Sequence, residues 1–250
     1  MRAMVLAAGL GTRLRPLTDN RPKALVEVGG RTLLEITLAR LNSFGIREVI
    51  INVHHFADMI VDYLKANKDF GMRIEVSRED DVLLDTGGGL KEAAYFLENS
   101  GAAEEPFVLH NVDVISTIDL HRMAQFHSEN HALATLAVQD RPTSRYLLFD
   151  EQLQLCGRKS GRDGQAELVR NSSHPKALAF SGIHVIRPRL FSLMTEEGVF
   201  SIIAPYLRLA AQGEKIIAFR SDEYQWRDLG RLDDVMQADQ DARQLSGRPK

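Results

Sequence analysis

The sequence predicts a Rossmann-like α/β fold in which a mixed, mostly parallel sheet is flanked by helices. In the first half of the chain, short apolar runs alternate with helical patterns, an order typical of a parallel sheet covered by helices. These runs are continuous and largely apolar, as expected for strands that are buried on both faces. After about residue 132, several strands follow one another and are joined by polar loops.

The first half of the chain is expected to contain four strands and four helices. The strands are predicted at residues 3–8, 48–53, 73–77 and 107–111. The helices are predicted at residues 32–44, 57–65, 89–97 and 119–127. The first helix has the clearest boundaries, because Thr32 and Glu35 have the spacing of a capping box and Gly45 follows as a helix terminator.

The second half of the chain is expected to add strands at residues 133–139, 145–149, 154–158, 177–186 and 215–219. Two further helices are predicted near residues 201–212 and 231–244. Residues 159–175 and the two termini are expected to be loosely ordered. Because no linker or internal repeat interrupts the pattern, we expect a single domain of 250 residues whose halves, about 1–131 and about 132–250, share one sheet.

The composition is that of an ordinary globular protein without marked charge. Hydrophobic residues make up 44% of the chain and charged residues 26%, and the formal net charge is -3. This balance shows no basic excess for nucleic acid, and no apolar run reaches the roughly 20 residues needed to cross a membrane. Cys156 is the only cysteine, which excludes an intrachain disulfide and a cysteine-based zinc site. We therefore expect a cytoplasmic protein with no nucleic-acid or membrane partner.

The most informative stretch is a glycine-rich loop after the first predicted strand. It has the sequence LAAGLGTRLRPLT over residues 6–18 and is followed by the pair Pro22-Lys23. Glycines let backbone N–H groups approach an anion closely, and successive N–H groups form a concavity that binds phosphate. Arginine and lysine side chains add positive charge where a polyphosphate would lie. The candidate phosphate contacts are Ala8, Gly9, Gly11, Thr12, Arg13 and Lys23.

Two other phosphate-binding motifs are absent from this stretch. A P-loop would end in Gly-Lys-Ser/Thr, and the sequence has no such run. A dinucleotide-binding fingerprint would need glycine or alanine where the sequence has Leu14. The loop therefore predicts a phosphate site of another kind and disfavours an NAD-dependent oxidoreductase.

The stretch from residue 6 to residue 23 closely resembles the signature of the sugar-1-phosphate nucleotidylyltransferases. Its Gly-x-Gly-Thr-Arg-Leu-x-Pro-Leu-Thr run and the following Pro-Lys pair match the pattern of that family. The resemblance implies a nucleoside triphosphate and a sugar 1-phosphate as substrates and Mg²⁺ as cofactor. It also implies that Arg13 and Lys23 bind the triphosphate and act in catalysis. Residues 1–131 would then bind the nucleotide, and residues 132–250 the sugar phosphate.

Two aspartates are candidate metal ligands. Asp113 follows the strand predicted at 107–111, and ligands of open α/β sheets gather at the carboxyl ends of strands. Asp228 lies in a Trp-Arg-Asp-Leu-Gly segment just before the last predicted helix. Two carboxylates and phosphate oxygens suit the oxygen shell of Mg²⁺, and the resemblance implies this role for both residues. From the residues alone, Asp113 could equally form a turn and Asp228 could cap a helix.

Two other glycine-containing segments are weaker candidates. Three glycines follow Thr86 directly before a predicted helix, and such a run is costly in conformational entropy unless the backbone must approach something closely. The resemblance implies that Thr86, Gly87 and Gly88 contact the nucleotide. A glycine inside the strand predicted at 177–186 also suggests a close approach. Here the resemblance implies that Ser181 and Gly182 lie beside the sugar.

The implied chemistry is a direct displacement that needs no protein nucleophile. A phosphate oxygen of the sugar 1-phosphate attacks the α-phosphorus of the nucleotide in line, and pyrophosphate leaves. Within the family, the chain is most similar to the short N-acetylmuramate 1-phosphate uridylyltransferases of cell-wall recycling, which would make UTP and N-acetylmuramate 1-phosphate the substrates. The lactyl carboxylate of that acceptor would need a cation, which Arg158, Lys159 or Arg162 could supply.

Several alternatives stay open from the sequence. Heptose or mannose 1-phosphate guanylyltransferases fit the same motifs. A non-catalytic nucleotide-sugar-binding regulatory protein would keep the fold but would be expected to lack Lys23, Asp113 or Asp228, and all three are present. His127 and His131 could hold a metal on a helix, but their polar neighbours predict solvated side chains. The sequence gives no indication of the oligomeric state.

Overall fold

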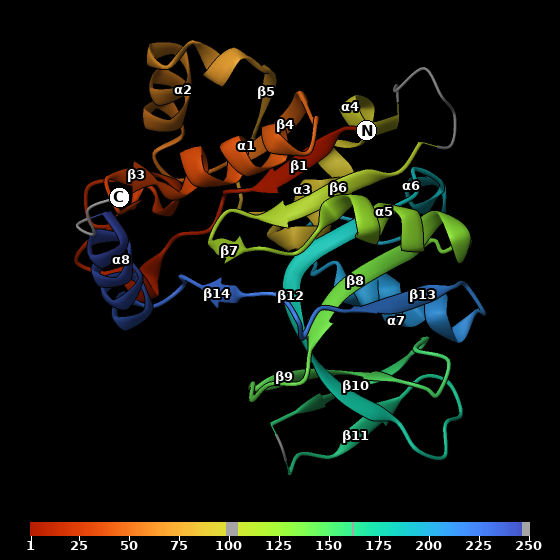
Figure 1. The fold of residues 1–250 in the computed structure, drawn as a ribbon. Coiled ribbons are helices and arrows are strands. Elements are labelled where there is room, and N and C mark those ends of the chain that lie inside the picture. The colour runs from red at the N-terminus through yellow and green to blue at the C-terminus, as the bar shows by residue number, and fades with distance from the viewer. Residues whose placement is uncertain (99–104, 162, 247–250) are drawn as a thin grey trace.

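The computed structural model describes residues 1–98, 105–161 and 163–246, and it shows an α/β fold with one large sheet covered by helices (Figure 1). Across these residues the sheet has 10 strands in the order β11-β10-β9-β12-β6-β1-β4-β5, with β8 and β13 joined through β12. The prediction of a Rossmann-like α/β fold with a mixed, mostly parallel central sheet is confirmed. The same sheet runs through both predicted halves of the chain.

Parallel strands form the centre of the sheet. They are β1 (Ala3–Leu6), β4 (Glu48–Val53), β5 (Arg73–Arg78) and β6 (Phe107–Asn111). β1 pairs with β4 on one side and with β6 on the other, so that Val5 lies opposite both Ile51 and His110. Because the strands are parallel, their carboxyl ends meet at one edge, where β1 runs into the glycine-rich loop and β6 runs toward Asp113.

The antiparallel part of the sheet belongs to the second half of the chain. Its strands are β8 (Ala134–Gln139), β9 (Arg145–Phe149), β10 (Leu155–Ser160), β11 (Ala166–Leu168), β12 (Lys176–Ile186) and β13 (Ile216–Arg220). The long strand β12 is antiparallel to β6, β8 and β9 and so connects this part to the parallel centre, while β13 is parallel to β8. Figure 1 shows β9, β10 and β11 projecting from the rest of the molecule.

Two hydrophobic cores lie between the sheet and its helices. The helices are α1 (Leu33–Ser43), α2 (Ala57–Ala66), α3 (Asp85–Glu92), α4 (Ala94–Glu98), α5 (Leu120–Glu129), α6 (Arg189–Leu193), α7 (Ile203–Ala211) and α8 (Leu232–Ser246). One core contains residues of α1, α2, α5 and α8, and the other contains residues of α3, α4, α6 and α7. β1 contributes to both, since Val5 lies in the first core and Met4 in the second. None of the described helices is long and apolar enough to cross a membrane.

Several boundaries agree with the sequence prediction. The strands predicted at 48–53, 107–111 and 145–149 are observed with those bounds. Helix α1 begins after Thr32, whose Oγ1 accepts a hydrogen bond from the backbone N–H of Glu35 (3.0 Å). The Glu35 carboxylate instead accepts a hydrogen bond from Arg31 (2.7 Å). Only one of the two hydrogen bonds of a capping box is therefore present.

Two other boundaries are wrong. The helix predicted at 89–97 begins at Asp85, and its three glycines lie inside α3 rather than before it. Glycine is a poor helix former, but it occupies these helical positions because the tertiary packing around them leaves no room for a side chain. The loop predicted at 159–175 contains β11, which pairs with β10. All three residues of β11 are exposed, so no alternation of apolar and polar residues marks this strand in the sequence.

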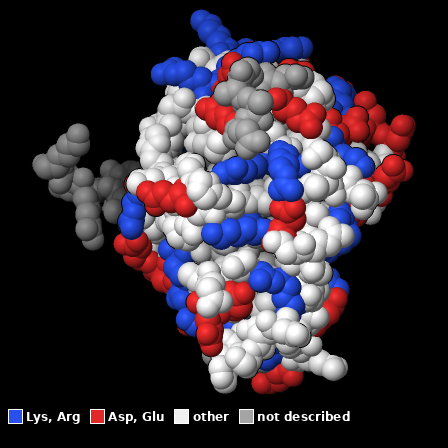
Figure 2. Space-filling view, turned by 90° about the vertical axis from the view of Figure 1, so that its right-hand side faces the viewer, with Lys and Arg blue, Asp and Glu red and all other residues white. Residues whose placement is uncertain are grey.

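Short elements at the edge of the fold were not predicted. They are the short helix α6, the 3-10 helices η1 (Thr12–Leu14), η2 (Lys23–Leu25) and η3 (Lys68–Gly71) and the strands β2 (Glu27–Val28), β3 (Arg31–Thr32), β7 (Val114–Ser116) and β14 (Trp226–Asp228). α8 packs beside β2, where the Gly29 N–H donates a hydrogen bond to Asp239 (2.9 Å). On the face shown in Figure 2, basic and acidic side chains are interspersed.

Candidate active site

A small two-stranded sheet brings the two candidate metal ligands together. β7 and β14 are antiparallel, with Asp228 opposite Val114, and the Leu229 N–H donates a hydrogen bond to the backbone oxygen of Asp113 (2.8 Å). Trp226 anchors the other end of β14, because its Nε1 donates a hydrogen bond to the backbone oxygen of Ser181 (2.8 Å). Asp113 and Asp228 therefore lie side by side although they are far apart in the sequence.

Gly230 leaves a small space between these carboxylates. A methyl group at this position would lie 2.8 Å from Asp228 Oδ1 and 3.4 Å from Asp113 Oδ2. It would also lie 2.9 Å from Arg13 Nη2. Two carboxylates and one guanidinium group thus surround a space that any side chain at position 230 would fill.

Positive charge is favoured at this place. The Lys23 ammonium forms an ion pair with Asp113, and both side chains are largely buried. The pKa of the Asp228 carboxyl is raised, mainly by loss of water around it and next by the neighbouring Asp113 carboxylate. The charges of Lys23 and Arg13 act in the opposite direction on that pKa. A further cation bound here would relieve the repulsion between the two carboxylates.

The residues at this place fit a hard divalent cation. The donors are carboxylate oxygens, the ligand type that Mg²⁺ prefers, and Gly230 keeps the space between them open. Among the described residues, no group of three or more histidine, cysteine, aspartate or glutamate side chains could hold a metal. A cation held by Asp113 and Asp228 would therefore complete its shell with phosphate and water oxygens.

The glycine-rich loop turns sharply between β1 and η1. Gly11 has a φ of +65°, in the left-handed region, and a methyl group there would lie 2.9 Å from Thr18 Cγ2 and 3.2 Å from Lys23 Cβ. The Thr18 hydroxyl donates a hydrogen bond to the backbone oxygen of Gly11 (2.8 Å). Gly11 therefore lets the loop pack against the segment that carries Lys23. Thr12 and Arg13 follow on η1, where both are exposed.

A first cavity of about 390 Å³ lies beneath this loop, at the carboxyl ends of β1 and β6. Ala8 and Gly9 line it from the loop, and Lys23 and Asp113 line it from the carboxylate side. Asn111 lies at the end of β6 and also lines the cavity. With Thr86, the structure thus brings together five of the predicted site residues around one cavity, with backbone, ammonium and carboxylate groups in its wall.

A second cavity of about 660 Å³ adjoins the first. Its wall includes side chains from β9, β10 and β12, among them Arg145, Lys159 and Phe180. Asp85, Thr86 and Asn111 line both cavities. Molecules bound in the two cavities would therefore lie next to each other.

Thr86, Gly87 and Gly88 occupy the first turns of α3. Thr86 lines both cavities, and its hydroxyl accepts a hydrogen bond from the backbone of Ile202 (3.0 Å). Gly87 and Gly88 lie behind the wall, where both N–H groups point to the backbone oxygen of Phe200 (2.9 and 3.3 Å). A methyl group on Gly87 would lie 2.4 Å from the Phe200 ring. The close approach predicted at these glycines is made to Phe200, and their contact with a nucleotide stays a prediction.

Ser181 and Gly182 also lie in the wall rather than on its surface. Ser181 is fully buried, and its backbone oxygen binds Trp226. Gly182 has a φ of +74°, and a methyl group there would lie 2.8 Å from Val114 Cγ2 and 3.0 Å from Asn111 Nδ2. These two residues therefore support β7 and β14, and their contact with a sugar stays a prediction.

Asn52, at the carboxyl end of β4, is a site residue that the sequence analysis missed. Its Oδ1 accepts a hydrogen bond from the Ala7 N–H (2.8 Å), and its Nδ2 donates one to Glu79 (2.7 Å). Glu79 in turn accepts a hydrogen bond from the Leu84 N–H (2.8 Å), just before α3. This network ties the glycine-rich loop to α3. A polar residue inside the otherwise apolar run 49–53 was the signal that could have identified it.

The fold and the site together define a class of protein. The model of the nucleotidyl transferase family matches residues 2–151, which include the glycine-rich loop, Lys23 and Asp113. The chain therefore belongs to the nucleotidyl transferase family, and it is a sugar-1-phosphate nucleotidylyltransferase.

The most similar relatives include two N-acetylmuramate alpha-1-phosphate uridylyltransferases. That of Caulobacter vibrioides is 35% identical over 221 residues, covering 84% of this chain and 85% of the relative. That of Neisseria meningitidis is 33% identical over 216 residues, covering 83% and 84%. The mannose-1-phosphate guanyltransferase of Yarrowia lipolytica is 28% identical over 238 residues. That alignment covers 94% of this chain and 62% of the relative.

Solved structures share the fold at low sequence identity. UDP-glucose pyrophosphorylase in complex with UDP-glucose has a TM-score of 0.78 at 17% identity, covering 98% of both chains. HddC from Yersinia pseudotuberculosis in complex with GMP-PN has a TM-score of 0.74 at 20% identity, covering 96% of this chain and 98% of the other. These likenesses show the fold alone.

Proposed function

We propose that this protein transfers the uridylyl group of UTP to N-acetylmuramate 1-phosphate, giving UDP-N-acetylmuramate and pyrophosphate. The observation that carries the proposal is the cluster of Asp113, Asp228, Lys23 and Arg13 around the space at Gly230, beside two adjoining cavities. The choice of substrates is supported by two relatives named for this activity, at 35% and 33% identity over most of both chains.

The two cavities would divide the substrates between them. The smaller one would hold the nucleotide, because the backbone of Ala8 and Gly9 and the Lys23 ammonium line it. The larger one would hold the sugar phosphate, because the strands of the second half of the chain line it. This division corresponds to the two halves of a single domain, residues 1–131 and 132–250. The shared residues Asp85 and Thr86 would then lie between the two substrates.

The residues of the cluster position the phosphates and neutralise charge. Arg13 and Lys23 would bind the triphosphate and stabilise the charge that develops as pyrophosphate leaves. Asp113 and Asp228 would hold Mg²⁺, which, when bound, supplies positive charge to the reacting phosphates. The ion pair with Asp113 keeps the Lys23 ammonium at the reacting centre. No protein nucleophile takes part, since the acceptor phosphate attacks the nucleotide directly.

The lining of the larger cavity suits an acceptor with a carboxylate. Arg158 is bound to Glu167 (2.6 Å), so its charge is already compensated. Arg145 and Lys159 have no ion-pair partner among the described residues and line the same cavity. They would supply the cation for the lactyl group. Arg162, the third candidate from the sequence, lies outside the described residues.

The test is pyrophosphate release with UTP and GTP, each combined with the 1-phosphates of N-acetylmuramate, N-acetylglucosamine, heptose and mannose. We expect the highest kcat/KM for UTP with N-acetylmuramate 1-phosphate and complete loss of activity in a chelator, restored by Mg²⁺. N-acetylglucosamine 1-phosphate is the matched control, because it differs from the proposed acceptor only by the lactyl group. A preference for GTP with mannose or heptose 1-phosphate would contradict the proposed substrates and leave nucleotidyl transfer in place.

A further inference from the structure

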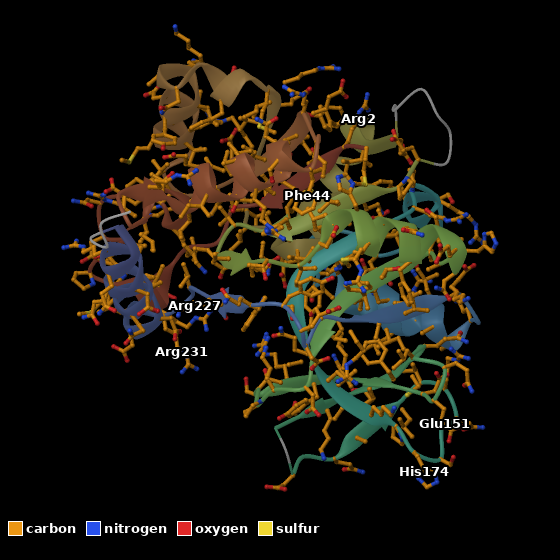
Figure 3. All side chains as sticks on the ribbon, viewed as in Figure 1. Arg2, Phe44, Glu151, His174, Arg227 and Arg231 are labelled. Atoms are coloured by element: carbon orange, nitrogen blue, oxygen red, sulfur yellow. The ribbon has the colours of Figure 1, made fainter. Side chains whose placement is uncertain are left out.

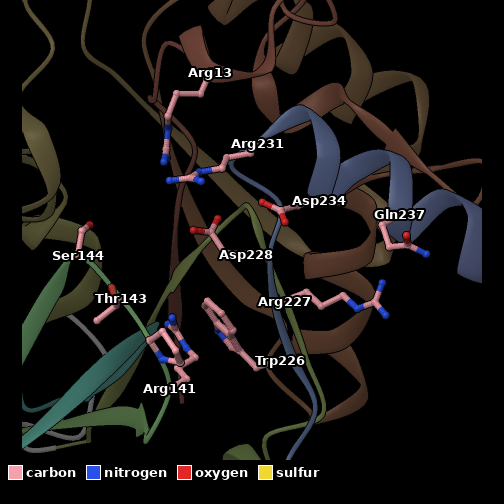
Figure 4. A pocket seen from close by; sticks show the side chains of 11 residues that line it. Arg13, Arg141, Thr143, Ser144, Trp226, Arg227, Asp228, Arg231, Asp234 and Gln237 are labelled. Carbon is pink, nitrogen blue, oxygen red and sulfur yellow. The ribbon is translucent and has the colours of Figure 1, made fainter. Parts of the chain in front are cut away.

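A third cavity, of about 520 Å³, also opens at the carboxylate pair, and it shares no lining residue with the other two. It lies between the loop after β8, strand β14 and the beginning of α8 (Figure 4). Arg13 and Asp228 line it, so it is continuous with the space at Gly230 that the proposed reaction uses. The third cavity is therefore a separate space that opens at the reacting centre, with a wall of its own.

Positive charge predominates in this third cavity. Four arginines and two aspartates line it among the described residues. Two of the arginines have fixed partners. Arg227 forms an ion pair with Asp241, and Arg141 stacks on the Trp226 ring at 3.6 Å while donating a hydrogen bond to the Phe180 backbone oxygen (2.8 Å). These contacts hold the two side chains in place as walls of the third cavity.

Arg13 and Arg231 are the two uncommitted arginines. Among the described residues, the guanidinium group of neither one has a hydrogen-bond or ion-pair partner. Figure 4 shows the two guanidinium groups next to each other, with Asp228 close by. Arg227 and Arg231 lie near β14 and α8 at the side of the molecule (Figure 3). Like charges placed side by side repel each other, and an anion bound between them would remove that cost.

We propose that the third cavity is the binding site of the pyrophosphate leaving group and that Arg231, together with Arg13, holds it. The proposal rests on the nucleotidyl transfer proposed above. An in-line displacement requires the leaving group to depart on the side opposite the attacking oxygen, so it needs a space other than the acceptor's. The third cavity is such a space, because it reaches Asp228 and shares no lining residue with the proposed acceptor cavity. A guanidinium group offers parallel N–H donors that match two phosphate oxygens, so a pair of arginines suits a diphosphate.

The charge that Arg231 meets arises in the displacement itself. The acceptor phosphate oxygen forms a bond to the α-phosphorus, and the bond from the α-phosphorus to the bridging oxygen breaks. The electron pair of that bond stays with the bridging oxygen, so negative charge grows on the departing pyrophosphate. Arg231 precedes α8, and the partial positive charge at the amino-terminal end of the helix acts in the same direction.

The test is calorimetric titration of the free protein with inorganic pyrophosphate in a buffer that contains Mg²⁺. We expect Arg231→Met to raise the dissociation constant of pyrophosphate at least about tenfold, because it removes a charge-assisted contact. Arg231→Lys keeps the positive charge but loses the parallel N–H donors of the guanidinium group, so it should raise the dissociation constant less than Arg231→Met does. Arg227→Met is the matched control, since Arg227 lines the same cavity but is bound to Asp241, and it should change the dissociation constant by less than about twofold.

Binding of UMP separates a local effect from a general one. UMP lacks the two phosphates that leave as pyrophosphate. The dissociation constant of UMP should therefore be the same for Arg231→Met as for the wild-type protein. The inference is overturned if Arg231→Met binds pyrophosphate normally, if Arg227→Met weakens it equally, or if UMP binding falls in parallel. The titration needs no acceptor. A protein that binds pyrophosphate through Arg231 but prefers other substrates therefore contradicts only the substrate choice made above.

Discussion

The carboxyl group of Asp228 lies beside that of Asp113, and its pKa is raised first by loss of water and then by the neighbouring charge. A carboxyl with a raised pKa binds its proton more tightly in the folded state than in the unfolded state. The free energy of unfolding therefore falls as the pH rises from the ordinary value through the raised one. At a pH above the raised pKa, where the group is ionised, Asp228 costs stability.

We therefore predict opposite effects of Asp228→Asn on stability and on activity. The substitution removes a repelled charge, so the melting temperature at pH 7 should stay the same or rise. Turnover in the pyrophosphate-release assay should fall by about 100-fold or more, because the electrostatic arrangement at the phosphates is lost. Thermal unfolding and steady-state kinetics of the same preparation provide the measurement.

Asp241→Asn is the control for this prediction. The pKa of Asp241 is lowered by its hydrogen bond with Gln237 and by Arg227. The ionised Asp241 carboxylate therefore favours the folded state, whereas that of Asp228 disfavours it. Its loss should not raise the melting temperature, and turnover should stay near normal. Near-normal turnover in Asp228→Asn, or a fall in its melting temperature larger than that of Asp241→Asn, would contradict the prediction.

At the scale of single elements, local signals decided which parts of the fold could be predicted. The runs that became β4 and β6 are mainly apolar, and Thr32 marks the start of α1 by its own hydrogen bond. The start of α3 could not be predicted from local sequence. Its glycines are needed because Phe200 and Gly198, which are far along the chain, pack too closely against them to leave room for a side chain. β7 and β14 have three residues each and carry no periodic pattern. Motifs led to the predicted residues that the structure brings together at the first cavity, such as Gly9 and Lys23. Asn52 and Arg231 belong to no motif, and only the tertiary structure shows their neighbours.

Gly88→Ala tests the packing of α3. Alanine favours a helix over glycine by about 1 kcal/mol, so propensity alone predicts stabilisation. The added methyl group, however, would lie 2.4 Å from the backbone oxygen of Gly198, which cannot move as a side chain can. Overpacking costs about 1–3 kcal/mol, so we expect a net loss of stability in denaturant unfolding.

Gly9→Ala serves as the matched control for stability. A methyl group on Gly9 would meet no atom within 4 Å, and Gly9 does not have a positive φ. Its free energy of unfolding should lie within about 0.5 kcal/mol of the wild-type value. If Gly88→Ala were as stable as Gly9→Ala, the close contact between α3 and Gly198 would be refuted.

At the scale of the whole molecule, buried histidines link stability to pH. Burial lowers the pKa of His110 and His127 to about 4 and that of His184 to about 3. The prediction of a solvated His127 was wrong. Its ring is fully buried, and Nδ1 lies 2.9 Å from Thr135 Oγ1, because α5 packs against β8.

These histidines should make the protein sensitive to mild acid. A lowered pKa means that the unfolded state binds the proton first, so stability is complete above pH 6.5 and is lost as the pH falls toward 4. Each histidine contributes on the order of 3 kcal/mol to this loss. His127→Asn should show a shallower fall of the free energy of unfolding between pH 6.5 and 4. An unchanged pH dependence would show that His127 does not titrate in this way.

The pairing of β7 with β14 also has a consequence for the order in which the molecule becomes competent. A ribosome delivers the glycine-rich loop, Lys23 and Asp113 early, but it reaches Asp228 only after most of the chain has been made. Until then the Asp113 carboxylate lacks the neighbour that β14 provides. An unfinished chain that ends before Asp228 therefore lacks the carboxylate pair, even though it already contains β1 and β6.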